Sequence, residues 1–89
     1  MITLYRTDGT KEDFPQEILT LEWMQEQVGG YVEKIHVTRD TSILCNEDGW
    51  PMKLPIAHPE VNELYHENLD TFTFLLGNCI VVSSPNKIP

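Results

Sequence analysis

The stretch LEWMQEQVGGYVEKIHV, residues 21–37, decides how this chain folds. A helical spacing of apolar residues runs up to two glycines, and a strand-like alternation follows them. Leu21, Met24 and Val28 recur at i, i+3 and i+7, so they form one stripe on a helix. The pattern predicts a helix over residues 21–28 with these three side chains in the core.

The paired glycines, Gly29 and Gly30, mark the end of that helix. Gly29 suits the left-handed position at which many helices stop, because it has no side chain to clash. At the other end, Thr20 is the expected N-cap. Gly30 then lets the backbone turn into residues 31–37, whose alternation predicts a half-buried strand. Gly30 has either this geometric role alone or a second one, which is to let a ligand approach the backbone.

Turn and strand signals extend the pattern in both directions. Asp8-Gly9 predicts a hairpin turn, and residues 42–45 read as a short strand. His58 and Pro59 fit the N-cap and first position of a short helix to Tyr65. Gly77-Asn78 predicts a second hairpin between residues 70–76 and the apolar run at 79–82.

These elements predict one α+β domain over residues 1–89. Its sheet is expected to be small, mixed or antiparallel, with about five or six strands, one main helix and one short helix. We divide it into an N-terminal hairpin (1–15), a helix–strand core (20–83) and a loose tail (84–89).

The bulk composition excludes some classes of protein. The chain has 89 residues, of which 40% are hydrophobic, so disorder is not expected. Its 14 acidic and 6 basic residues give a net charge of −8, which repels phosphate backbones and argues against direct DNA or RNA binding. The excess suits solubility or a basic partner protein, and one local basic pocket remains compatible with it. A core of this size leaves little margin, which favours a homo-oligomer.

Nothing in the sequence indicates export or a membrane. The N-terminal MITLYRTDG has neither the charged nor the apolar region of a signal peptide. No apolar run approaches the ~20 residues that span a bilayer. We therefore expect a cytoplasmic protein, in which Cys45 and Cys79 are reduced core thiols rather than a disulfide.

No motif for catalysis, metal or cofactor binding is present. His36, His58 and His66 lie far apart and have no metal-ligand spacing. The serines lack a nucleophile elbow, and no phosphate-binding loop occurs, since Gly29-Gly30 follows a helix instead of preceding one. The carboxylates all look like exposed faces and turns. We therefore expect a protein that is not an enzyme.

One proline-stiffened loop collects groups that suit a ligand. NEDGWPMKLPIAH, residues 46–58, places Trp50, Met52, Lys53 and His58 close together in sequence. An aromatic ring that stacks beside a cation is what a nucleotide pocket uses. The alternative is that Trp50 and Met52 simply cover the sheet.

The order of motifs resembles a family of small phage- and bacterium-encoded proteins known as a domain of unknown function. The resemblance rests on LEWMQEQVGGYVEKI, ILCNEDGWPMKLPIAHPEVNELY and FLLGNCIVV, and it covers about residues 20–83. The combination of G-G-Y, N-E-D-G and G-N-C-I-V-V carries it. Relatives often have asparagine after the proline of K-x-L-P, where this chain has IAHPEV, so a role for that asparagine does not transfer.

The resemblance implies a small protein of a mobile element with no established chemistry. Such proteins often act by binding, so the leading hypothesis is a non-enzymatic phage protein that sequesters a small anionic ligand, a nucleotide messenger of host antiphage immunity. Tyr31 or Trp50 would stack on the base, with His58 beside them. Lys53, Arg6 or Arg39 would contact the phosphate, assisted by the backbone amides near Gly29-Gly30, with Gly30 as the expected site residue. A second protomer would complete the pocket.

Two alternatives remain open. An acidic mimic of DNA could present carboxylates to a basic host protein and inhibit it; those carboxylates are Glu22, Glu26, Glu47, Asp48, Glu60 and Glu63. Its binding should collapse with salt. The other alternative is a structural or regulatory phage protein without a ligand pocket.

Overall fold

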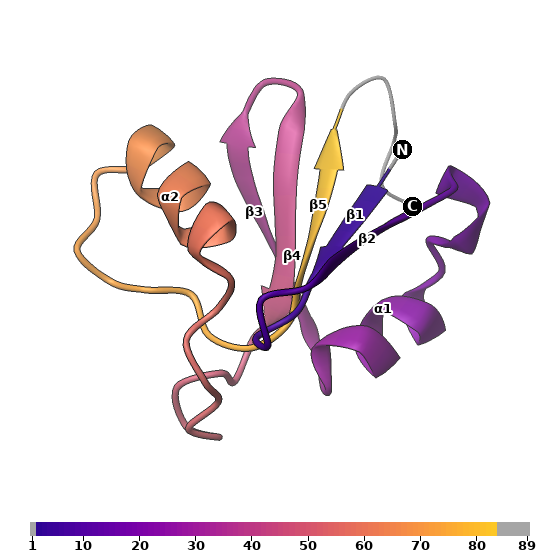
Figure 1. Cartoon of the computed structure of the whole chain (residues 1–89), viewed down its shortest axis with the longest axis horizontal. Coiled ribbons are helices and arrows are strands. Elements are labelled where there is room, and N and C mark those ends of the chain that lie inside the picture. Colours follow the sequence, from indigo (N-terminus) through magenta and orange to yellow (C-terminus); the bar gives the residue numbers. More distant parts are fainter. Residues whose placement is uncertain (1, 84–89) are drawn as a thin grey trace.

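The computed structural model describes residues 2–83 and shows an antiparallel sheet with one helix on each face (Figure 1). In chain order the elements are β1 (Ile2–Tyr5), β2 (Lys11–Phe14), a 3-10 helix η1 (Gln16–Ile18), α1 (Leu21–Val28), β3 (Val32–Thr38), β4 (Thr41–Asn46), α2 (Pro59–Asn68) and β5 (Cys79–Ser83). The five strands lie in the order β2-β1-β5-β4-β3, and every pairing is antiparallel. The expected α+β class is confirmed. The expected loose tail lies outside the described residues.

Helix α1 begins and ends where its sequence predicts. The Thr20 hydroxyl accepts a hydrogen bond of 3.2 Å from the Trp23 backbone N–H, which caps the first turn. Gly29 follows the last turn with φ of 80°, in the left-handed region that glycine adopts without strain. Met24 and Val28 are buried as expected.

The prediction that Leu21 lies in the core is wrong, because its side chain is 60% exposed. Leu19, just before the N-cap, is buried and fills that part of the core instead. Trp23 also turns inward and packs edge-on against Phe14, with ring centroids 5.1 Å apart. The spacing i, i+3, i+7 identifies residues that share one face of a helix. Which end of that face is buried depends on the segment that precedes the helix.

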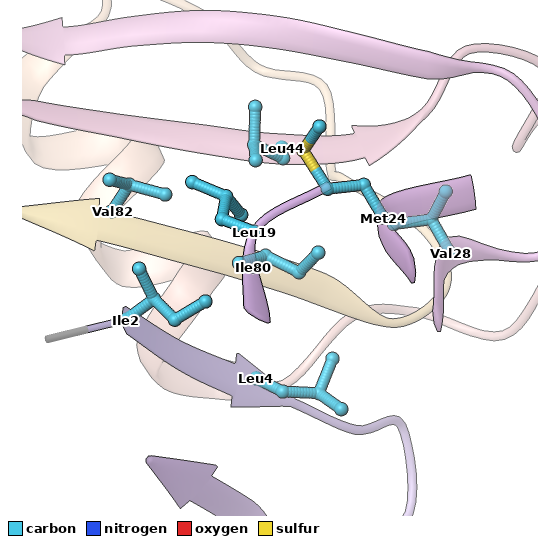
Figure 2. Close-up of a cluster of buried hydrophobic side chains, with 8 residues drawn as sticks. All are labelled: Ile2, Leu4, Leu19, Met24, Val28, Leu44, Ile80 and Val82. Atoms are coloured by element: carbon cyan, nitrogen blue, oxygen red, sulfur yellow. The ribbon is translucent and has the colours of Figure 1, made fainter. Parts of the chain in front are cut away.

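Two apolar clusters lie on opposite faces of the sheet, and together they explain the unbroken run CIVV. Ile80 and Val82 of β5 face α1 and belong to the cluster in Figure 2. Cys79 and Val81 point to the other face, where they pack with side chains of α2 and the loops beside it. A strand covered on both faces has no wet side, so its sequence reads as continuously apolar.

The predicted strand over residues 70–76 is absent, and so is the hairpin at Gly77-Asn78. Only Leu76 makes a β-bridge, an isolated one to Ile56. Both neighbours of β5 are already taken by β1 and β4, so this segment cannot pair with β5 as a hairpin would require. The segment instead follows α2, where the buried Asn62 amide accepts the Leu75 N–H at 2.7 Å. Phe72 is left 97% exposed.

The two thiols are reduced and buried, as the sequence predicts. Leu44 pairs with Ile80 in the register of β4 and β5, so Cys45 and Cys79 are the next residues across from each other. Burial raises the pKa of Cys45 to about 12, and burial also raises the pKa of Cys79. Because a thiolate is the reactive form, neither thiol is activated for chemistry.

We expect both thiols to stay unlabelled by a disulfide reagent until the chain unfolds. Folding raises both pKa values, so the protonated thiols contribute to the free energy of unfolding. That contribution is fully present below the unfolded pKa of 9.0 and is lost progressively as pH rises above it. Urea titrations between neutral and alkaline pH would measure that slope. A variant with both cysteines changed to alanine should show a shallower slope, and rapid native-state labelling would contradict the burial.

Candidate functional site

The turn after β4 is fixed to the end of α1 by one buried side chain, that of Asn46. Its Nδ2 donates to the Val28 carbonyl at 3.1 Å, and its Oδ1 accepts the Asp48 N–H at 2.7 Å. A further contact of 3.6 Å joins Nδ2 to the Met52 sulfur. The side chain thereby joins two segments that are distant in sequence, and this role is not visible in the sequence beyond the start of an N-E-D-G turn.

Gly30 lies directly against this amide. A Cβ at Gly30 would stand 2.9 Å from Asn46 Nδ2, closer than side chains pack. The Gly30 N–H donates to the Gln25 carbonyl at 3.1 Å, as part of the helix end. Its amide is therefore occupied, so the expected phosphate contact at Gly30 would need this bond to break.

Three large side chains stand exposed around this fixed turn: those of Tyr31, Trp50 and Met52, which we call the aromatic face. Their exposed fractions are 69%, 62% and 50%. The Tyr31 carbonyl accepts the Glu47 N–H at 2.8 Å, so the link before β3 and the turn after β4 lie side by side. Trp50 and Met52 therefore do not simply cover the sheet, which was the alternative interpretation of this loop.

A hollow of about 290 Å³ lies where the end of α1 meets three loops, and we call it the helix-end hollow. It is lined by Thr7, residues 26–29, residues 54–55 and residues 77–78. Asn78 ties these segments together, because its Oδ1 accepts the Thr7 N–H at 3.0 Å and its Nδ2 donates to the Gln27 carbonyl at 3.4 Å. Sequence reasoning missed this hollow, since no single stretch contains it.

The expected cations do not gather at one place. The Arg6 guanidinium is paired with Glu12 at 2.7 Å on the N-terminal hairpin. Arg39 follows β3 while Tyr31 precedes it, so their backbones stand about 26 Å apart along the strand. Lys53 alone shares the turn of Trp50, where its φ is 54°. A ligand that stacks on Tyr31 would have to extend along most of β3 to reach Arg39.

His58 belongs to a different, polar cluster at the start of α2. Its Nδ1 accepts the Glu60 N–H at 3.0 Å as the expected N-cap, and its ring packs edge-on against Tyr5 at 5.0 Å. Lys11 bonds Glu60 at 3.0 Å, which raises the pKa of the lysine and lowers that of the carboxyl. Burial, followed by the nearby Glu60 charge, raises the pKa of the Tyr5 phenol.

This polar cluster borders a hollow of about 260 Å³ on the N-terminal hairpin, lined by Thr3, Tyr5, Lys11, Glu12 and Asp13. Its charged groups already have partners, because Lys11 meets Glu60 and Asp13 accepts the Thr3 hydroxyl at 2.7 Å. The cluster stabilises the contact between the hairpin and α2.

One serine–histidine contact was not predicted. The Ser42 hydroxyl lies 3.3 Å from His36 Nδ1, across the pairing of β3 and β4. Neither residue lines the two hollows described above, and within residues 2–83 His36 makes no hydrogen bond to a carboxylate. The geometry is that of a cross-strand polar pair rather than of an activated nucleophile.

Within residues 2–83, no group of three or more His, Cys, Asp or Glu side chains is arranged to hold a metal ion. No helix in that part of the chain has the length and apolar character that a membrane span requires.

Comparison with known proteins gives one family. Searches of curated proteins and of solved structures found no match. A family model described as "Domain of unknown function (DUF3846)" matches residues 2–88, which is nearly the whole chain and extends beyond the segment on which the resemblance rested. The protein therefore belongs to the DUF3846 family.

Proposed function

We propose that this protein acts by binding, without catalysis of its own, and that its partner is a protein with a basic surface that covers the aromatic face. The observation that carries the proposal is the exposure of Tyr31, Trp50 and Met52 around a turn that Asn46 holds in place. Tyrosine, tryptophan and methionine are enriched at the centres of protein interfaces.

The fixed turn matters because ordering a loop at the moment of binding reduces affinity. Here the turn is already ordered by hydrogen bonds within it, such as Leu54 N–H to the Gly49 carbonyl at 3.1 Å. Gly49 is buried against Leu76, where a Cβ would stand 3.3 Å from the leucine Cβ. The aromatic side chains are therefore presented from a backbone that need not rearrange.

The charge around the aromatic face selects the partner. Glu47 and Asp48 begin the turn and are exposed, and the whole chain carries a net charge of −8. Complementary charge accelerates association with a basic protein and makes it sensitive to salt. The sequence raised an acidic mimic of DNA that inhibits a basic host protein as an alternative; the partner proposed here is also basic, but the contact centres on exposed aromatic side chains, with Glu47 and Asp48 beside them.

Replacing Trp50 with serine is expected to abolish capture of the partner and to leave stability within about 0.5 kcal/mol, because the ring is mostly exposed. The measurement is affinity capture from lysate of the host cell, with retained proteins quantified by mass spectrometry and then confirmed with the purified partner. Wild-type binding should weaken as salt rises.

Leu21→Ser is the matched control, because Leu21 is 60% exposed against 62% for Trp50 but lies at the start of α1. It should retain the partner. Equal capture by the Trp50 and Leu21 variants would refute the aromatic face as the contact surface. Sedimentation of the wild type and W50S adds one further readout. Loss of a dimer in W50S would mean that a second copy of this chain covers the aromatic face, which would agree with the predicted homo-oligomer but contradict the basic partner, since each copy carries a net charge of −8.

A second candidate function is nucleotide sequestration, in which the protein would bind and withhold a nucleotide messenger of host antiphage immunity. The observation that favours it is that Trp50 and Lys53 share one turn, with the Lys53 N–H bonded to the Trp50 carbonyl at 3.0 Å. It ranks second because Arg6 is paired elsewhere and Arg39 lies at the far end of β3.

Thermal-shift measurements with cyclic di- and trinucleotides and with ADP-ribose distinguish the two candidates. A rise in Tm with the nucleotide recovered intact after heat release would favour the sponge over the protein partner. A nucleotide recovered in altered form would contradict the expectation of a non-enzymatic protein. We expect no shift with any of these compounds.

A further inference from the structure

The helix-end hollow is large enough to admit one side chain. Its volume is about 290 Å³, just below the range for small-molecule sites, which begins at about 300 Å³. Val28, Leu54 and Pro55 supply apolar wall, while Thr7 and Asn78 supply polar groups. A ligand with an aliphatic stem and a polar head matches this division.

The electrostatics of the hollow favour a cation. The carbonyl end of α1 carries the negative pole of the helix dipole, and no basic residue lies in its last turn to neutralise it. Two neutral amides contact the carbonyls there, Asn46 at Val28 and Asn78 at Gln27. Glu26, an exposed acidic residue, is among the residues that line the hollow, and none of the lining residues is Lys, Arg or His.

The backbone around the hollow is also fixed in advance. The Gly77 N–H donates to the Pro55 carbonyl at 2.7 Å, and Gly77 has φ of 85°. This positive φ favours glycine, and a Cβ at Gly77 would stand 2.9 Å from Leu54 Cδ1, so the end of that leucine side chain would have to move. The hollow is therefore a product of packing among four segments rather than a gap in a loose loop.

We propose that the helix-end hollow receives one basic side chain, a guanidinium or ammonium group, from the protein partner. The inference rests on the proposed function, because the hollow would supply a charge contact to the same partner that covers the aromatic face. The hollow and the aromatic face are formed by neighbouring residues of the chain. Leu54 directly follows Lys53 in the turn, and Tyr31 lies two residues after Gly29. The aliphatic stem would lie on Leu54 and Pro55, with the charged head toward Glu26 and the end of α1.

The test is an NMR titration of the ¹⁵N-labelled full chain with the capped tripeptide acetyl-Gly-Arg-Gly-amide. The same peptide with citrulline in place of arginine is the neutral control of nearly equal shape. Arginine should shift the amide signals of Gly29, Gly77 and Asn78, including the Asn78 side chain, and citrulline should not. Equal shifts with both peptides, shifts elsewhere only, or none at all would overturn the inference.

Glu26→Gln should weaken binding of the arginine peptide by about three- to five-fold, as loss of one exposed ion pair does. Glu22→Gln removes the same charge from the first turn of α1, away from the hollow, and should have no such effect. If both variants weakened binding equally, the effect would come from the change in net charge, and the hollow would not be the binding site.

This design separates the inference from the proposed function. If the purified partner binds wild type and E26Q equally and arginine causes no shifts, the hollow is not the receptor, while the aromatic face stands. If arginine binds in the hollow but W50S captures as much protein as wild type, the proposed function fails and the hollow remains a site for basic groups.

Discussion

Replacing Asn46 with alanine is expected to lower the free energy of unfolding by about 2–4 kcal/mol. The change leaves the Val28 carbonyl without its 3.1 Å donor and the Asp48 N–H without its 2.7 Å acceptor. It also leaves a small void against Gly30. In a domain of this size such a loss corresponds to a fall in Tm of roughly 10 °C or more, which calorimetry would measure.

The matched control for Asn46 is Asn68→Ala. Asn68 is exposed, and its Nδ2 donates only within its own helix, to the Leu64 carbonyl at 2.9 Å. Its loss should cost no more than about 0.5 kcal/mol. Two variants of equal stability would contradict the role assigned to Asn46.

A carboxyl at position 46 tests the donor separately. N46D keeps an acceptor for Asp48 but faces the Val28 carbonyl without the amide donor, so burial should raise the pKa of the introduced carboxyl above its unfolded value. A group with a raised folded pKa adds stability below the unfolded pKa, and that stability is lost as pH rises through the folded pKa. N46D should therefore be more stable in acid than at neutral pH relative to wild type.

Replacing Asn62 with alanine is expected to cost a similar amount, about 2–4 kcal/mol. The buried Asn62 side chain accepts the Leu75 N–H at 2.7 Å and donates to the carbonyls of Leu75 and Ala57 at 3.3 and 3.4 Å. These bonds replace the strand pairing that the segment before β5 lacks. Hydrogen exchange at Leu75 and Ala57 should accelerate in the variant, and calorimetry should show the loss of stability.

Faster exchange confined to these two amides, with Tm unchanged, would mean that the segment adds little to folding. Exchange and Tm both equal to those of N68A would mean that Asn62 does not hold the segment at all.

Local signals in the sequence were sufficient for much of the fold. Thr20 and Gly29 define the ends of α1 because a cap depends only on residues within one turn. Asp8-Gly9 defines the β1–β2 hairpin for the same reason, since a tight turn needs one residue with positive φ, which Gly9 adopts at 92°. His58 as the N-cap of α2 is a third example. Each of these predictions is confirmed.

The candidate site could be predicted only in part. The exposed Trp50, Lys53 and Tyr31 come from segments whose loop character is evident in the sequence. The separation between these residues and Arg39 is not evident in the sequence, because it depends on the length of β3, which lies between Tyr31 and Arg39. The helix-end hollow is also absent from any local pattern, because its lining comes from four segments that meet only in the folded chain.

The sequence by itself determined which residues turn, cap and alternate, because those properties arise from neighbours along the chain. Only the tertiary structure decided which of them are covered. Residues 70–76 have the alternation of a strand, yet they remain outside the sheet because β1 and β4 occupy both edges of β5. Leu21 has helical spacing, yet it is exposed because Leu19 fills the core beside it. Only a limited number of segments and side chains can pack on the sheet, so whether one is buried depends on which others pack there. A local sequence pattern contains no information about those other segments.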